Sequence, residues 1–136
     1  MEGMASESQH LSTFIRRSVT AVYDYASDPA NLPQWAAGLS NGIHFEDGEW
    51  ISISPMGRVM VEMAEPNGWG VLDHWVTSAD GDLFYNPMRV IEAEGGSEVV
   101  FTLRRQPGMS DDAFEADAIA IVTDLATLKT VLESER

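Results

Sequence analysis

The chain has no cysteine, and only 8 of its 136 residues are lysine or arginine, against 22 aspartates and glutamates. Without a thiol, neither a disulfide framework nor thiolate chemistry is available. The formal net charge of −14 repels phosphate backbones and anionic lipid headgroups, which argues against binding to nucleic acid or a membrane surface. No apolar run approaches the roughly 18 residues of a membrane-spanning helix. The N-terminus lacks the basic and apolar regions of a secretory signal. We therefore expect a cytoplasmic protein with no membrane insertion.

Sequence patterns that hold metals or phosphates are also missing. The three histidines, His10, His44 and His74, are widely separated and fall into no His-x-His, His-x-x-His or Glu-x-x-His pattern. No glycine loop of the phosphate-cradling type precedes a helix. We therefore expect no metal site and no cofactor.

The middle of the chain is divided by turn signals. Pairs such as Asp47-Gly48 and Asn67-Gly68 supply the positive φ angles that tight hairpins require. They separate six strand-like segments, at 43–46, 49–54, 58–64, 69–78, 82–93 and 97–105. Short turns imply antiparallel neighbours. Together with a first strand at 11–18, these segments predict one curved antiparallel sheet of seven strands.

Two short helices are predicted between the first strand and the rest of the sheet. Asp28 is a good N-cap, and Pro29 stands at the first helical position that follows it. Leu32 and Trp35 supply apolar anchors for the second of these helices. Their place in the chain suggests that they close one end of the sheet.

The chain ends in a single long amphipathic helix. Ser110 is the expected N-cap, and the two aspartates that follow it favour the positive end of the helix dipole. Steps of four and three residues then place one apolar stripe along the helix, formed by Phe114, Ala118, Ile121, Leu125, Leu128 and Leu132. A stripe of this length needs a matching surface, which the concave face of the sheet provides.

The order of these elements and one motif resemble a known superfamily. The motif is Val-Tyr-x-Tyr-Ala-Ser-Asp-Pro-x-Asn-Leu-Pro-x-Trp at 22–35, and the segments 85–90 and 101–109 add to the likeness. Together they resemble a small uncharacterised bacterial branch of the START/polyketide cyclase-like (SRPBCC) superfamily. The resemblance implies an α+β helix-grip fold, in which a long helix lies across a curved sheet and a cavity lies between them. We expect one such domain at 10–136, after a flexible segment at 1–9.

Side-chain alternation predicts which residues line this cavity. In the last strand Val99, Phe101 and Leu103 share the inward face, and the same parity turns His74 and Asn86 inward. The predicted ligand-binding residues are Trp35, Val61, Met63, Leu72, His74, Asn86, Met88, Phe101, Phe114 and Ile121. A mostly apolar enclosure with a few polar groups is typical of a ligand pocket. We therefore expect binding of a small hydrophobic or aromatic molecule, such as a lipid, polyketide or phenolic compound.

Two other functions remain open. A cyclase or dehydratase would use His74 as the catalytic acid or base, with Asn86 or Tyr85 polarising a carbonyl. The simpler interpretation of His74 is a hydrogen-bonded structural histidine. A protein-interaction module would instead use an outward patch around Trp75, in a monomer or weak homodimer.

Two arginines have alternative roles as well. An inward guanidinium of Arg17 or Arg105 would suit a ligand carboxylate. Pairing with the abundant surface carboxylates is the simpler alternative.

Overall fold

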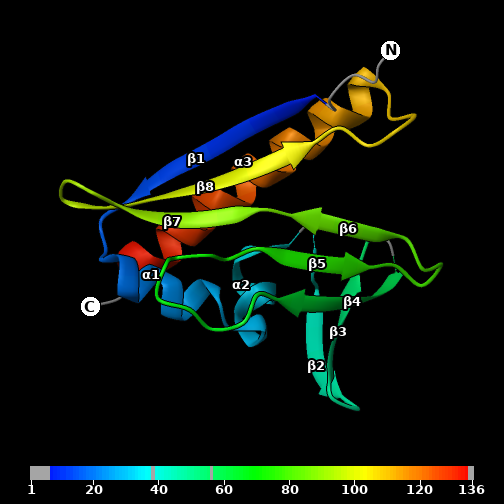
Figure 1. Cartoon of the computed structure of the whole chain (residues 1–136), viewed down its shortest axis with the longest axis horizontal. Helices are drawn as coiled ribbons and strands as arrows, with labels where there is room; N and C mark the ends of the chain where they lie inside the picture. Colours follow the sequence, from blue (N-terminus) through cyan, green and yellow to red (C-terminus); the bar gives the residue numbers. More distant parts are fainter. Residues whose placement is uncertain (1–6, 38, 56, 135–136) are drawn as a thin grey trace.

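The computed structural model describes residues 7–37, 39–55 and 57–134, which form an α+β fold (Figure 1). The elements in chain order are β1 (Ser8–Ile15), α1 (Val19–Ala26), the 3-10 helix η1 (Pro29–Asn31), α2 (Leu32–Trp35), β2 (Gly42–Glu46), β3 (Glu49–Ser54), β4 (Gly57–Met63), β5 (His74–Thr77), β6 (Leu83–Asn86), β7 (Met88–Ala93), β8 (Gly96–Arg104) and α3 (Asp111–Ser134). β1 begins at Ser8, inside the segment expected to be flexible. The part of that segment before Glu7 lies outside the described residues, as does Met56, which the sequence Pro55-Met56-Gly57 places in a turn between two predicted strands.

The strands form two antiparallel sheets rather than one. One has the order β1-β8-β7, and the other has the order β2-β3-β4-β5-β6. The α+β class and the antiparallel pairing are confirmed, but the prediction of a single sheet of seven strands was wrong, since the described residues form eight strands in two sheets. In Figure 1 β6 and β7 follow one another along the chain and carry it from one sheet to the other.

The division between the sheets falls at a proline. The predicted strand at 82–93 is interrupted at Pro87, which has no backbone N–H to give to a ladder. Beside the break, backbone bonds join β7 to the segment that leads into β5: Leu72 donates to the carbonyl of Met88 and Val90 donates to that of Gly70, each at 2.9 Å. Only the second half of the predicted strand at 69–78 belongs to β5, because its first half pairs along β7 in this way.

The long helix α3 has the predicted cap and the predicted buried face. The hydroxyl of Ser110 accepts a hydrogen bond from the backbone N–H of Ala113 at 3.1 Å. Five stripe residues are buried and Ile121 is partly buried: the five are Phe114, Ala118, Leu125, Leu128 and Leu132. Figure 1 shows the helix running along the sheet of β1, β8 and β7. Helices long and apolar enough to cross a membrane are not found in the described part of the chain.

The two short helices predicted after β1 are present and pack into the core. Ser18 caps α1 by accepting a bond from Ala21 N–H at 3.1 Å, and Asp28 caps η1 by accepting from Ala30 N–H at 3.0 Å. Val22 and Trp35 are buried in the same apolar cluster as the α3 stripe. The helices therefore hold α3 and the sheets in one core.

Candidate functional site

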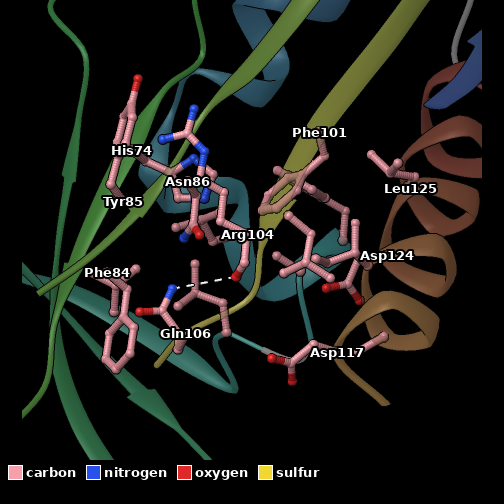
Figure 2. Close-up of a pocket in the computed structure, with 18 of the residues that line it drawn as sticks. His74, Phe84, Tyr85, Asn86, Phe101, Arg104, Gln106, Asp117, Asp124 and Leu125 are labelled. Carbon is pink, nitrogen blue, oxygen red and sulfur yellow. Dashed lines mark hydrogen bonds between the residues drawn. The ribbon is translucent and has the colours of Figure 1, made fainter. Parts of the chain in front are cut away.

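A cavity of about 340 Å³ lies between α2, the strands β5 and β6, the end of β8 and the middle of α3 (Figure 2). Most of its lining is apolar and comes from Leu32, Trp35, Ala36, Leu39, Val76, Phe84, Phe101, Leu103, Met109, Ala120, Ile121 and Leu125. The polar residues of the lining are His74, Tyr85, Asn86, Arg104, Gln106, Asp117 and Asp124. The arrangement offers apolar surface on most sides and polar atoms at a few defined positions.

Half of the predicted lining residues reach this cavity. Those that line it are Trp35, His74, Asn86, Phe101 and Ile121. They come from five separate elements, α2, β5, β6, β8 and α3, and the fold brings them together. Whether they bind a ligand stays a prediction.

The other five predicted residues lie elsewhere. Val61, Leu72 and Met88 do face inward, but they are at most 2% exposed and belong to the sealed core. Met63 packs against that core from its edge. Phe114 lies near the start of α3, where it borders a separate groove beside β1. Inward parity therefore placed Val61, Leu72 and Met88 on the correct face but did not show that this part of the interior is packed.

His74 is the most deeply buried of the polar residues that line the cavity. It is 5% exposed, and its Nδ1 lies 3.1 Å from the carbonyl oxygen of Leu72. Since a carbonyl oxygen only accepts hydrogen bonds, Nδ1 carries the proton and donates it. The ring also packs edge-to-face on Phe101, with 6.0 Å between the ring centroids. Burial lowers the pKa of His74, while the bond to Leu72 and the charge of Asp73 act in the opposite direction.

Asn86 stands beside His74 on the neighbouring strand. The two are direct cross-strand partners in the β5–β6 ladder, so their side chains share a face. The Asn86 amide forms no hydrogen bond with any side chain or backbone group that the structure describes. It therefore offers both a donor and an acceptor to the cavity.

Trp35 contributes apolar surface and one buried donor. The residue is 6% exposed, and its indole Nε1 has no hydrogen-bond partner within the described ranges. A buried donor without a partner costs free energy. Its ring forms the α2 side of the cavity.

Two acidic residues of α3 border the cavity, and the sequence analysis missed them. Asp117 and Asp124 are among the lining residues, and Figure 2 shows them on the helix, across the cavity from His74 and Asn86. Burial raises the pKa of Asp117. Their spacing of four and three residues from Ile121 puts all three on one helical face, a signal that was present in the sequence.

The hydroxyl of Tyr85 is engaged by a buried carboxylate. It donates to Oδ2 of Asp73 at 2.8 Å, and this bond is the main reason that the pKa of Tyr85 is raised. The Tyr85 ring stacks on Trp75 with 5.2 Å between centroids, which is a cross-strand packing contact. Asp73 itself is only 7% exposed.

The two arginines considered for a ligand carboxylate are bound to protein groups. Arg17 donates to the carbonyl of Leu132 at 2.7 Å. Arg105 donates to the carboxylates of Glu7 and Asp111 and to the carbonyl of Met109. Neither arginine lines the cavity.

Residues 38–42 have the sequence Gly-x-Ser-x-Gly, a pattern in which the central serine is the nucleophile of many hydrolases. The central Ser40 is 1% exposed, and its hydroxyl donates to the carbonyl of Gly42 at 3.1 Å. It lies between a helix and a strand, in the reverse order to a strand-to-helix elbow. Ser40 is therefore a structural residue. No group of three metal-ligating side chains occurs within the described ranges.

No family model matches the chain, and no curated protein matches it. Solved structures do match. An uncharacterized protein from Bacillus thuringiensis shares 16% identity with a TM-score of 0.73, covering 93% of this chain and 98% of that one. Ara h 8.0201 shares 10% identity with a TM-score of 0.69, covering 96% and 100%. DynU16, from the dynemicin biosynthetic locus, shares 12% identity with a TM-score of 0.71, covering 96% of this chain and 48% of its own. At 10–16% identity, these neighbours show that the chain shares their fold.

Proposed function

We propose that the protein binds a small hydrophobic or aromatic molecule, such as a lipid, polyketide or phenolic compound, in the cavity between α2, β5, β6 and α3. The observation that carries the proposal is the make-up of the lining, in which apolar side chains surround a few polar groups. The volume of about 340 Å³ lies at the small end of the roughly 300–1,000 Å³ of ligand pockets, which suits a compact ligand.

The fold supports this proposal but does not carry it, since one fold hosts many functions. DynU16 belongs to a biosynthetic locus and has a similar fold, which agrees with the proposed binding of a small organic molecule. Binding requires neither nucleic acid nor a membrane. The proposal includes a cytoplasmic location and a monomer or weak homodimer.

The proposal is tested by filling the cavity from the helix. Ala120 lines the cavity, so the larger ring of Ala120→Phe would occupy part of it. Ala126 is also exposed on α3 but is not a lining residue, so Ala126→Phe is the matched control with the same change in helix propensity. We expect Ala120→Phe to weaken binding of an aromatic probe such as 2-naphthol at least tenfold, and Ala126→Phe to leave it unchanged. Equal affinities in both variants would place the probe elsewhere.

A second candidate, a cyclase or dehydratase, is favoured by the pairing of His74 with Asn86. Catalysis of this kind needs two groups near one substrate atom. His74 offers a neutral nitrogen as a base, and the Asn86 amide beside it is free to polarise a carbonyl. An enzyme would lose turnover in His74→Phe and still bind its substrate. Ligand binding without turnover in the wild-type protein would favour the proposed binding function over catalysis.

A protein-interaction role through Trp75 has less support. Its ring is half-buried and stacked on Tyr85, which is the ordinary packing alternative. A change of oligomeric state in Trp75→Ala, with ligand binding intact, would favour this role instead.

A further inference from the structure

We propose that the cavity selects neutral ligands with a hydroxyl group, phenols or alcohols, and that this hydroxyl donates a hydrogen bond to Nε2 of His74. The inference rests on the proposed function and narrows its ligand class. Fatty acids and other carboxylates would be disfavoured at this position.

The proton of the His74 ring is fixed on the nitrogen that faces away from the ligand. Nδ1 donates to the carbonyl oxygen of Leu72, 3.1 Å away. In a neutral imidazole with a proton on Nδ1, Nε2 has a lone pair and no proton, and can only accept. The bond to the Leu72 carbonyl therefore makes Nε2, the nitrogen that faces the cavity, a hydrogen-bond acceptor.

Nε2 is accessible from the cavity. It bonds to none of the groups described in the structure. Of the described side chains, Trp35 alone has a sealed nitrogen or oxygen without a partner, so Nε2 of His74 is not sealed in the core. Since His74 lines the cavity, the surface that Nε2 retains is open to a ligand.

The surroundings keep His74 neutral. Burial is the largest influence on its pKa and lowers it, against the raising effects of the bond to Leu72 and the charge of Asp73. Phe101 of β8 covers the ring edge-to-face, and Asn86 of β6 is uncharged. Asp73, the neighbour on its own strand, already has its carboxylate oxygens bonded to Tyr85 and Met88. At neutral pH the group that meets the ligand is therefore an acceptor.

The charges around the cavity disfavour an anionic ligand next to His74. A carboxylate at Nε2 would bring two acceptors together, and Asp117 and Asp124 lie across the cavity on α3 (Figure 2). The one cation among the lining residues, Arg104, is exposed and acts electrostatically on Tyr85. A carboxylate held by Arg104 would be paired with the guanidinium and would not use the acceptor Nε2 of His74.

Three matched compounds test this inference on the wild-type protein at neutral pH. 2-Naphthol carries the hydroxyl, 2-methoxynaphthalene has the same rings without the proton, and 2-naphthoate is the carboxylate. We expect 2-naphthol to bind about fivefold more tightly than the ether, the ratio that one net hydrogen bond gives. We expect 2-naphthoate to bind most weakly. Equal affinity of the naphthol and the ether, or tightest binding of the naphthoate, would overturn the inference but leave the proposed function standing. If none of the three binds, the proposed function itself fails.

Substitution and pH supply independent readouts of the same bond. His74→Phe keeps a ring but has no acceptor, so the ratio of naphthol to ether affinity should fall to about one. Should that variant not fold, the wild-type protein still answers the question: lowering the pH through the depressed pKa of His74 protonates Nε2 and should weaken naphthol binding but not ether binding. His44→Gln removes an exposed histidine outside the cavity and should retain this pH dependence. The same pH dependence for naphthol and ether would contradict the proposed bond.

Discussion

The side-chain carboxylate of Asp73 accepts a hydrogen bond from the backbone N–H of Met88, with 2.8 Å between Oδ1 and the nitrogen. The bond spans the break at Pro87, where β6 ends and β7 begins. Oδ2 of the same carboxylate accepts from the hydroxyl of Tyr85, and the guanidinium of Arg89 lies 3.5 Å from Oδ1. The buried Asp73 side chain thus bonds the backbone N–H of Met88, the first residue of β7, and the hydroxyl of Tyr85 in β6, so it connects the two sheets.

Removing this carboxylate should destabilise the protein. Asp73→Ala leaves the buried N–H of Met88 without its partner, which costs about 1–3 kcal/mol of the free energy of unfolding. Asp73→Asn retains one side-chain oxygen and should cost less. Urea unfolding of the two variants and the wild-type protein measures the difference. Equal stability of Asp73→Ala and the wild-type protein would show that the junction does not depend on this bond.

The phenol of Tyr85 should ionise at a higher pH than an ordinary tyrosine. Its bond to Asp73 favours the protonated hydroxyl and raises its pKa above the ordinary value of 10.0. In an absorbance titration, the phase that disappears in Tyr85→Phe should therefore be centred above pH 10. In Asp73→Asn this phase should move down towards pH 10, because the charged acceptor is gone. A Tyr85 phase centred at or below pH 10 in the wild-type protein would contradict this assignment.

Gly70 should not tolerate a side chain. Its φ of +72° lies in the left-handed region, and a Cβ there would stand 2.2 Å from the carbonyl oxygen of Val90. Gly81 has a similar φ of +90° with nothing within 4 Å, so Gly81→Ala isolates the backbone strain of about 1–2 kcal/mol. Gly70→Ala should lose clearly more of the free energy of unfolding than this control. Equal losses would mean that the strand pairing beside Pro87 is looser than described.

The stability of the protein should depend on pH through His74. Because burial lowers its pKa below the ordinary value of 6.5, the unfolded chain takes up a proton before the folded protein does. The free energy of unfolding should therefore fall as the pH is lowered from about 6.5 towards the depressed pKa, and level off for this group below it. Comparison with His74→Phe over the same range isolates the effect from that of the carboxylates. Parallel pH profiles of the two proteins would contradict the burial of a neutral ring.

Elements with strong local signals could be predicted from the sequence. The cap at Ser110 and the apolar stripe of α3 act within a few residues of one another, and both are confirmed. The same holds for Asp28 before Pro29 and for the inward face of Val99, Phe101 and Leu103 in β8. In these cases the residues that decide the structure are close together in the chain.

Features that depend on distant residues were missed. The proline at 87 carries a recognisable signal for a break, but the alternation on both sides of it reads as one strand. Asp73 finds its partner fifteen residues away, at a junction that exists only after the sheets have formed. No local sequence pattern predicts such a bond.

The cavity was only half predictable for a related reason. Alternation tells which face of a strand a residue occupies, and His74 and Asn86 follow that rule. It does not tell how far α3 and the sheets close over that face, so Leu72 and Met88 were expected in the cavity and are in the sealed core. The extent of closure depends on how all the elements pack.

Titration of the wild-type protein with 2-naphthol, followed in amide NMR spectra, tests the presence of a working cavity most directly. If the ligand binds in this cavity, we expect saturable shifts of the amides of His74 and Asn86 in the sheet and of Ile121 in α3. Saturation without shifts at these residues, shifts confined to exposed aromatic residues such as Phe45 and Trp69, or no saturable shift would contradict ligand binding in this cavity.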